Sequence, residues 1–523
     1  MIPGGRKMKG ERLNTISRWA EKTAAAMILI LVFAFILYLT ICAYCETSLL
    51  NTDDVSGENI EFYADNIFVN IIVLAILLSA GYLFYRHCDP LSVRRMENAL
   101  MFWTFAFGTA FIATTKLRSP IYSDSFLVTY GAQRAALGDY AILGESYFYR
   151  FPFQLGYVLY SELFFRAANI VLRGEPEGYA VVALQELNLF WLLVEYHALI
   201  EITGLLFKNV RIRKLLILLM FGCLPPVLTT TFLYGNTPAF ACGALAVWMF
   251  LSFMKTDRLR DGLLCALFLV LAVTLKLNLL IVCVAVGLVW LVMLLKQPGK
   301  KSLLCFLLAA VCVLTLPSLP QKIYERRVGV RYGDGIPMIA WMAMGFSEGH
   351  AAPGWYREDY TVSAFERSGY DSAATAANAK QALAERVGFF RENPAEARRF
   401  FSAKLRSQWN EPSYGSLWVN QVFPSYSQKG NMYEFLCEKG AKVTLALMNQ
   451  YQQFIFLGLL FGIIRLWRKK DIRRCLLTLV LLGGLLYHLL FEAKSQYAMP
   501  YFVLILPIAA YGLFTLFRKV DLR

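Results

Sequence analysis

Asp124 is a carboxylate placed where it could act as a base at a membrane surface. It follows Pro120 and precedes the stretch Phe126 to Leu137, whose apolar residues recur at helical spacing. An aspartate at the start of a helix accepts backbone N–H bonds as a cap. A carboxylate near the membrane could instead take the proton of a hydroxyl acceptor as a general base. Asp139, within Gly-Asp-Tyr, is the reserve candidate, and a turn explains it equally well.

A few basic side chains interrupt or border apolar stretches and could bind an anion. Lys276 stands in Leu-Lys-Leu-Asn, Lys494 stands in Glu-Ala-Lys-Ser-Gln-Tyr, and Arg150 lies between aromatic residues. A lysine at a span end also snorkels to the interface without binding anything, and aromatic neighbours could anchor Arg150 there. The four histidines are scattered and no metal-ligand spacing occurs, so a structural zinc is not expected.

The elements that must position these residues are apolar and long. The chain has 523 residues, of which 57% are hydrophobic and only 17% charged, with a mean hydropathy of +0.48. A soluble domain carries roughly 25% charged residues, so a soluble enzyme is excluded. Runs of about 18 to 22 apolar residues match the thickness of a bilayer. The formal charge of +15 is concentrated in short loops, where it indicates topology and no nucleic-acid partner.

Hydropathy predicts an all-α polytopic membrane protein with about twelve spans. The stretch 153–172, interrupted by Glu162 and Arg166, is expected to lie in the interface or re-enter. With one crossing between 180 and 206, all later basic loops fall on one side, so both termini are expected to be cytoplasmic. The predicted spans are 24–45, 67–85, 98–115, 180–206, 214–233, 238–254, 259–275, 277–295, 302–319, 448–467, 474–491 and 499–517.

The topology divides the chain into four predicted parts. Residues 1–97 hold a cytoplasmic start and two additional spans, and 98–320 hold a transmembrane core with the outer loop 116–152 and its interfacial helices. Residues 321–445 form a small extracytoplasmic domain, and 446–523 hold the last spans. Within the outer domain, Ser372 to Arg406 is predicted to be helical and broken at Pro394.

The order of several short motifs along the chain resembles the GT-C superfamily of integral-membrane glycosyltransferases, and more closely a branch in Gram-positive bacteria. The similarity runs from about residue 98 to the end, and the first two spans look like an addition to the usual core. The stretches that carry it are Ser119-Pro-Ile-Tyr-Ser-Asp124, Gly138-Asp139-Tyr140, Arg150-Phe-Pro-Phe-Gln-Leu-Gly156, Tyr234-Gly-Asn-Thr-Pro238, Lys276-Leu-Asn278, Pro353-Gly-Trp355, Gln408-Trp-Asn-Glu-Pro412 and Glu492-Ala-Lys-Ser-Gln-Tyr-Ala-Met-Pro500.

The resemblance implies transfer of a sugar, with inversion, from a polyprenyl-phosphate carrier to a cell-surface acceptor: a glycan, a glycolipid or a protein. Such a carrier suits an outward-facing site in the cell membrane, because nucleotide sugars are absent there. On this chain the catalytic base would be Asp124, and relatives place a basic residue beside the lipid phosphate at the position of Lys494. The predicted phosphate- and substrate-binding residues are Arg150, Gln154, Lys276, Asn278, Lys494, Gln496 and Tyr497.

Acceptor or sugar binding is assigned to a second group: Asp139, Tyr234, Asn236, Trp355, Trp409 and Glu411. Tryptophans of a small domain are also often buried, which leaves this assignment open. Many relatives carry a second acidic residue where this chain has Asn236, so a paired-carboxylate or metal-dependent mechanism is not expected. No cofactor is predicted, although a divalent metal is not excluded.

Two other functions remain open from the sequence. A flippase or transporter of lipid-linked intermediates would rely on intramembrane charges such as Glu195, and no internal repeat supports it. A surface-glycan polymerase or ligase would use a polyprenyl-diphosphate donor and need more cations than the outer loops supply.

Overall fold

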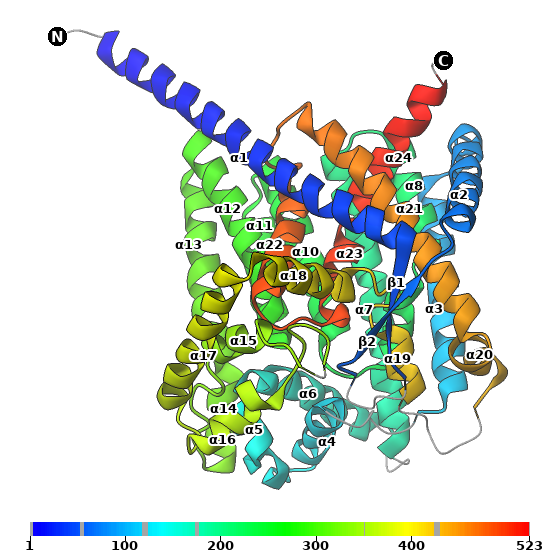
Figure 1. The fold of residues 1–523 in the computed structure, drawn as a ribbon. Coiled ribbons are helices and arrows are strands. Elements are labelled where there is room, and N and C mark those ends of the chain that lie inside the picture. The colour runs from blue at the N-terminus through cyan, green and yellow to red at the C-terminus, as the bar shows by residue number, and fades with distance from the viewer. Residues whose placement is uncertain are drawn as a thin grey trace.

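The computed structural model describes residues 4–52, 57–117, 124–172, 177–349, 351–422 and 429–521, with side chains from residue 21 onward except 172 and 177 (Figure 1). The regular elements are helices apart from one antiparallel hairpin, in which Glu46 pairs with Ala64 and Leu50 with Ile60. The predicted all-α class is therefore confirmed.

The first half of the chain carries the hairpin and most of the long helices. Its elements are α1 (Gly4–Cys45), β1 (Glu46–Leu50), β2 (Ile60–Ala64), α2 (Ile67–His87), α3 (Val93–Thr115), α4 (Asp124–Ala136), η1 (Ala141–Gly144), α5 (Ser146–Arg150), η2 (Pro152–Gln154), α6 (Leu155–Leu172), α7 (Glu177–Leu206), α8 (Val210–Phe221), α9 (Leu224–Leu228), η3 (Thr229–Thr231) and α10 (Asn236–Thr256).

The second half ends in three long or bent apolar segments. Its elements are α11 (Leu259–Leu275), η4 (Leu277–Leu279), α12 (Leu280–Lys296), α13 (Lys300–Thr315), η5 (Leu316–Ser318), α14 (Leu319–Val328), α15 (Met338–Gly345), η6 (Glu358–Tyr360), α16 (Val362–Arg367), α17 (Ser372–Glu392), α18 (Pro394–Trp409), α19 (Ser416–Val422), α20 (Asn431–Tyr433), η7 (Glu434–Glu438), α21 (Ala441–Trp467), α22 (Leu476–Leu490), α23 (Ser495–Leu504) and α24 (Leu506–Asp521).

Seven helical segments in the described part of the chain are long and apolar enough to cross a membrane, or nine if each of two bent pairs counts as one span. The seven are Glu21–Cys45, Ile67–His87, Gly178–Leu206, Asn236–Thr256, Leu277–Lys296, Lys300–Val328 and Ala441–Trp467, and the bent pairs are α8 with Leu224–Thr231 and α23 with α24.

The other three predicted spans form helices that are not among those long and apolar enough to cross a membrane. α11 has 17 residues and α22 has 15, and α3 carries Arg94, Arg95 and Glu97 near its start. The total of twelve spans therefore stays a prediction.

Loops that are basic in the sequence meet at one end of the bundle. Lys296, between α12 and α13, pairs with Glu21 of α1 at 2.6 Å, and the backbone N–H of Ile472 also donates to Glu21. Arg211 of α8 donates to Asp89 of the α2–α3 turn, and α24 finishes at this end, since Asp521 pairs with Arg86. In Figure 1 the start of α1 and the end of α24 both lie at this upper end.

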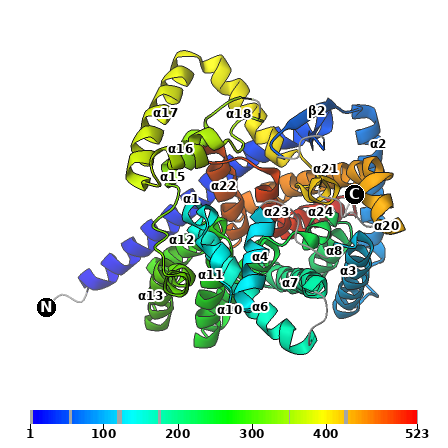
Figure 2. The same cartoon turned by 90° about the horizontal axis from the view of Figure 1, so that it is seen from below.

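The opposite end is built from turns, short helices and the β hairpin. Figure 1 shows α4, α5, α14 and α16 at this lower end, and Figure 2, from below, shows α15 to α18 gathered along one side. The region between α14 and α21 packs onto the apolar helices, with α18 against α23 and α15 against α22. The two ends of the bundle thus differ in kind: basic loops at one, layered helices at the other.

Several sequence predictions are sharpened here. The stretch from Ser372 forms two helices, α17 and α18, divided at Asn393 immediately before Pro394, as predicted. The predicted boundaries after residues 97, 320 and 445 fall inside α3, α14 and α21, and the division into four parts stays a prediction. Hydropathy marks where a helix becomes polar, and these helices continue past that point.

The stretch predicted to lie in the interface, 153–172, forms η2 and α6, which is not among the helices that could cross. Glu162, one of the two charges that interrupt it, is buried and pairs with Arg166 at 2.7 Å and with Arg327 of α14 at 3.0 Å. A buried carboxylate needs such partners. Glu162, whose charge argued against a span at 153–172, therefore holds α6 against α14.

Candidate active site

One cavity of about 710 Å³ lies at the end of the bundle opposite the basic loops. Its walls come from the turns between apolar helices, from α4 to η2, and from the β hairpin region. A volume of this size suits a ligand larger than a single small metabolite. Nine of the predicted site residues line it: Asp124, Arg150, Gln154, Tyr234, Lys276, Asn278, Lys494, Gln496 and Tyr497.

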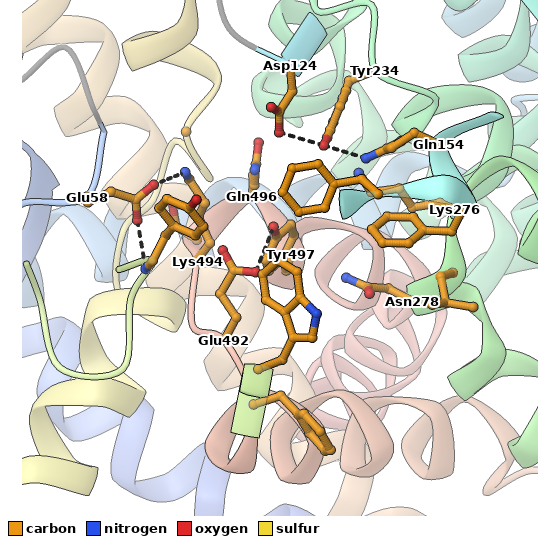
Figure 3. Close-up of a pocket in the computed structure, with 18 of the residues that line it drawn as sticks. Glu58, Asp124, Gln154, Tyr234, Lys276, Asn278, Glu492, Lys494, Gln496 and Tyr497 are labelled. Carbon is orange, nitrogen blue, oxygen red and sulfur yellow. Dashed lines mark hydrogen bonds and ion pairs between the residues drawn. The ribbon is translucent and has the colours of Figure 1, made fainter. Parts of the chain in front are cut away.

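Asp124 is the first residue of α4 and faces the cavity (Figure 3). The hydroxyl of Tyr234 donates to Asp124 Oδ2 at 2.8 Å, and the Gln154 side-chain amide donates to the Tyr234 oxygen. Because Asp124 stands in the first turn of the helix, the helix dipole favours its negative charge. The two sequence interpretations are therefore compatible: the residue begins a helix and presents a hydrogen-bonded carboxylate to the cavity. The residues 118–123 of its motif lie outside the described part.

Tyr234 reaches Asp124 because the chain turns tightly after it. Gly235 has φ +79°, and a Cβ at this position would lie 2.8 Å from the carbonyl oxygen of Leu275. Only glycine accepts both the left-handed conformation and this approach to the end of α11. The turn thereby sets Tyr234 beside Lys276, the residue that ends α11.

Lys276 presents its ammonium group to the face of the Tyr234 ring, with Nζ 3.7 Å from the ring centroid. Within the described ranges, no acidic side chain forms an ion pair with it. Burial lowers the pKa of Lys276 to about 7, although the charges of Asp124 and Glu492 oppose this effect. The site therefore holds a lysine whose charge is poorly compensated by the protein, which is a place where an anion would be stabilised.

Lys494, in the turn between α22 and α23, has a partner that the sequence did not predict. It forms an ion pair with Glu58, whose other carboxylate oxygen accepts the backbone N–H of Tyr356 at 3.1 Å. Burial opposes the charged form, but Glu58 and Glu492 together raise the pKa of Lys494. Glu58 belongs to the segment 46–66, which contains acidic residues and no Lys or Arg. An acidic segment without basic residues is the sequence signal that could have indicated a partner for one of the lysines.

Glu492 is a second carboxyl group beside this pair. It accepts a hydrogen bond from the Tyr497 hydroxyl at 3.3 Å. Burial, and then the charge of Glu58, raise the pKa of Glu492 to about 8. The group is therefore largely protonated near neutral pH.

Arg150 lines the cavity but is already engaged. Its guanidinium pairs with Glu366 at 2.6 Å and donates to Ser146 Oγ at 2.8 Å. The charge of Arg150 is therefore partly compensated within the protein. Arg150 is less available to a ligand than Lys276. Asn278 and Gln496 line the cavity as polar neighbours of the two lysines.

The remaining predicted residues do not line the cavity. Asp139 pairs with Arg134 at 2.6 Å at the surface and accepts the backbone N–H of Ala141, so it forms a turn. Asn236 is buried as the first residue of α10. Neither is in position to contact a ligand beside Asp124.

The predicted sugar-binding tryptophans and Glu411 are buried by packing. Trp355 is 0% and Trp409 1% exposed, and Trp355 donates its indole N–H to Ser407 at 2.8 Å. Glu411 accepts hydrogen bonds from the backbone and hydroxyl of Ser413. The structure places these three residues in packed surroundings and not on the wall of the cavity, so it gives no support to their assignment to sugar binding.

In the described part of the chain, no group of three or more histidine, cysteine, aspartate or glutamate side chains is placed to hold a metal ion. The cavity offers carboxylates, two lysines, amides and phenols as its polar chemistry. Such a set can bind a phosphate, bind hydroxyl groups and move a proton.

Comparison with known proteins gives a family and no activity. No curated protein matches the sequence. The model of a family described as conserved hypothetical integral membrane protein matches residues 189–514, which contain Lys276, Glu492 and Lys494 but not Glu58 or Asp124. The match extends over more than half of the chain, and the apolar helices agree with it. The protein therefore belongs to this family of conserved hypothetical integral membrane proteins.

Proposed function

We propose that the protein is an inverting glycosyltransferase of the GT-C type, which moves a sugar from a polyprenyl-phosphate carrier to a hydroxyl group of a cell-surface acceptor. One observation carries the proposal: the same cavity beside the apolar helices contains a hydrogen-bonded carboxylate, Asp124, and a lysine, Lys276, that forms no ion pair with an acidic side chain of the described residues. A base for the acceptor and a cation for the leaving group are the two charges that such a transfer needs.

In the reaction the acceptor oxygen forms a bond to the anomeric carbon, and its proton passes to the Asp124 carboxylate. The bond between the anomeric carbon and the phosphate oxygen breaks at the same time, and the polyprenyl phosphate leaves with the electron pair. Tyr234 orients the carboxylate by donating to Oδ2. Attack from the face opposite the leaving group inverts the configuration at the anomeric carbon.

Lys276 is the residue we assign to the donor phosphate, in place of Lys494, which the sequence favoured. An added anion gains most from a cation that has no carboxylate beside it. Lys276 has none among the described residues, whereas Lys494 is paired with Glu58. Lys276 also precedes α12, an apolar segment along which a polyprenyl chain could lie.

The cavity would open on the extracytoplasmic side. Basic loops face the cytoplasm in membrane proteins, and the contacts of Lys296, Arg211 and Arg86 gather such loops at the end away from the cavity. This orientation places both termini in the cytoplasm and the region 321–445 outside, with about twelve crossings when α3, α11 and α22 also span.

The test uses the purified protein in lipid with a panel of radiolabelled polyprenyl-phosphate sugars and a mixed glycan acceptor. Asp124→Asn keeps the shape of the side chain but removes its basicity, so transfer should fall by about 10² to 10⁴. Asp139→Asn, a matched change at an exposed aspartate of the same segment, should retain transfer.

Two results would contradict the proposal. Equal transfer by wild type and Asp124→Asn would remove the base. Movement of labelled lipid between leaflets by the wild type, with no transfer to any acceptor, would identify a flippase instead.

A further inference from the structure

The end of the cavity away from Lys276 holds a compact polar cluster: Glu58, Glu492 and Lys494, with Gln496 and Tyr497 beside them (Figure 3). The Lys494 side chain pairs with Glu58, and the Tyr497 hydroxyl donates to Glu492. We refer to these five residues as the Glu58 cluster. The proposed chemistry at Asp124 and Lys276 uses none of them.

The Glu58 cluster is close to electrically neutral. The negative charge of Glu58 compensates the positive charge of Lys494 within an ion pair. Burial and Glu58 raise the pKa of Glu492 to about 8, which removes most of a further negative charge near neutral pH. A phosphate brought to Lys494 would meet two carboxyl groups, so an anionic ligand is disfavoured at this end.

The hydrogen-bonding groups of the cluster are mixed. Lysine donates, carboxylate oxygens accept, and the amide of Gln496 and the phenol of Tyr497 do both. Tyr356, Trp418, Tyr487 and Phe491 supply aromatic surface in the same cavity. Alternating donors and acceptors match the vicinal hydroxyls of a sugar ring, and aromatic rings match its C–H face.

Glu58 reaches the cavity because the β hairpin between the first two apolar helices is fixed to the rest of the protein. The N–H of Ser48 donates to the carbonyl of Asn410 at 3.1 Å, and the N–H of Ala352 donates to the carbonyl of Glu58 at 3.0 Å. Gly57, with φ +67°, lies so close to Trp418 that a Cβ would be 2.5 Å from its ring. The hairpin is thus held in contact with the cavity wall.

We infer that the Glu58 cluster is a subsite for a neutral sugar ring, and that the two N-terminal apolar helices serve to deliver Glu58 to it. The inference rests on the proposed function and assigns a substrate class to the half of the cavity that the phosphate does not occupy. The ring could be the donor sugar or a sugar of the acceptor, since both present the same hydroxyl chemistry.

The test compares wild type with Glu58→Gln, which keeps the length of the side chain but removes its charge. Three probes are used: polyprenyl phosphate without sugar, polyprenyl-phosphate hexose, and a neutral oligosaccharide acceptor. Glu61→Gln on β2 is the matched control, because Glu61 bonds Asn51 and Tyr63 on the hairpin and does not line the cavity. Thermal unfolding in lipid verifies that both variants are folded.

A donor-sugar subsite predicts weaker binding of the sugar-bearing lipid by about tenfold or more, the loss expected for a hydrogen bond to a charged group. Binding of the bare lipid phosphate should not weaken, since removing the charge of Glu58 removes a repulsion. An acceptor subsite predicts a similar rise in KM for the oligosaccharide alone. Weaker binding of the bare lipid phosphate would overturn the inference, and so would three unchanged affinities. If Glu58→Gln does not fold, Glu492→Gln is used with the same outcomes.

Failure of the proposed function gives a different result. If the wild type prefers the sugar-bearing lipid over the bare lipid phosphate and Glu58→Gln removes this preference, the subsite stands even where no sugar is transferred. If the wild type transfers sugar but shows no such preference, and Glu58→Gln changes no KM, the subsite is overturned while the transferase stands.

Discussion

Lys276 and Lys494 occupy opposite sides of one cavity and differ in their partners (Figure 3). Lys494 is paired with Glu58 and has Glu492 nearby, and these carboxyl groups raise its pKa against the effect of burial. Lys276 lies over the Tyr234 ring without an acidic partner in the described ranges, and burial lowers its pKa to about 7.

The difference shows how two identical side chains acquire separate tasks. A paired lysine is part of the protein's own charge balance, so removing it harms the fold more than it harms anion binding. A buried lysine without an ion-pair partner lowers the stability of the protein when no ligand is bound. A bound phosphate stabilises its charge. Four measurements test this difference between the two lysines.

Lys494→Met should destabilise the protein by about 3–5 kcal/mol, because it removes the ion-pair partner of the buried Glu58 carboxylate. Lys276→Met should lower stability much less, since Lys276 forms no ion pair with an acidic side chain of the described residues and burial already disfavours its charge. Chemical unfolding in detergent measures both. Equal losses for the two variants would mean that the two lysines do not differ as described.

Lys276→Met should weaken binding of polyprenyl phosphate by about tenfold or more, the loss expected for hydrogen bonds to a charged group. The measurement is binding of the labelled lipid by protein in nanodiscs. Leu277→Met, at a neighbouring lining residue, is the control for inserting this side chain. Unchanged binding by Lys276→Met would remove the residue from the phosphate site.

Donor binding should weaken as the pH rises through about 7, because the free protein then loses the Lys276 proton that a bound phosphate requires. Above this pH the affinity should fall by up to about tenfold per pH unit. The sugar-bearing phosphodiester is the probe, since it has no proton to lose in this range. Lys276→Arg keeps its charge and should show no such slope, and a slope shared by both proteins would point to another group.

Tyr234→Phe should reduce kcat by about fivefold to tenfold, equivalent to the roughly 1 kcal/mol of one neutral hydrogen bond, because Asp124 loses its donor while the ring under Lys276 remains. KM for the donor should change little. A rise in KM with unchanged kcat would place the Tyr234 hydroxyl in substrate binding instead of in orienting the base.

The sequence predicted both lysines and the residues around Lys276, but it did not predict the partner of Lys494. Asp124, Lys276 and Lys494 stand out in the sequence as charged residues near the ends of predicted spans, and Tyr234 was predicted from a motif that resembles the GT-C superfamily. The structure brings all four to one cavity. Helical periodicity also located α17 and α18, with the break before Pro394.

Glu58 was missed for a physical reason. Its partner lies 436 positions away in the chain, and no local pattern indicates a pairing of that range. Burial has the same long-range origin. Trp355 and Trp409 were considered as sugar-binding residues because tryptophan suits that role, but both are buried, and Trp355 packs with Ile60 and Ala493, which are distant in the sequence. Positions of helix ends were likewise set by continued backbone bonding and not by hydropathy.

The most direct test of the central claim is the configuration of the sugar in the product formed by the purified protein from a labelled polyprenyl-phosphate donor. The account predicts a product of inverted anomeric configuration with the wild type and no product above background with Asp124→Asn. A retained configuration, or equal product from both proteins, would contradict a mechanism in which Asp124 takes the proton of the attacking hydroxyl.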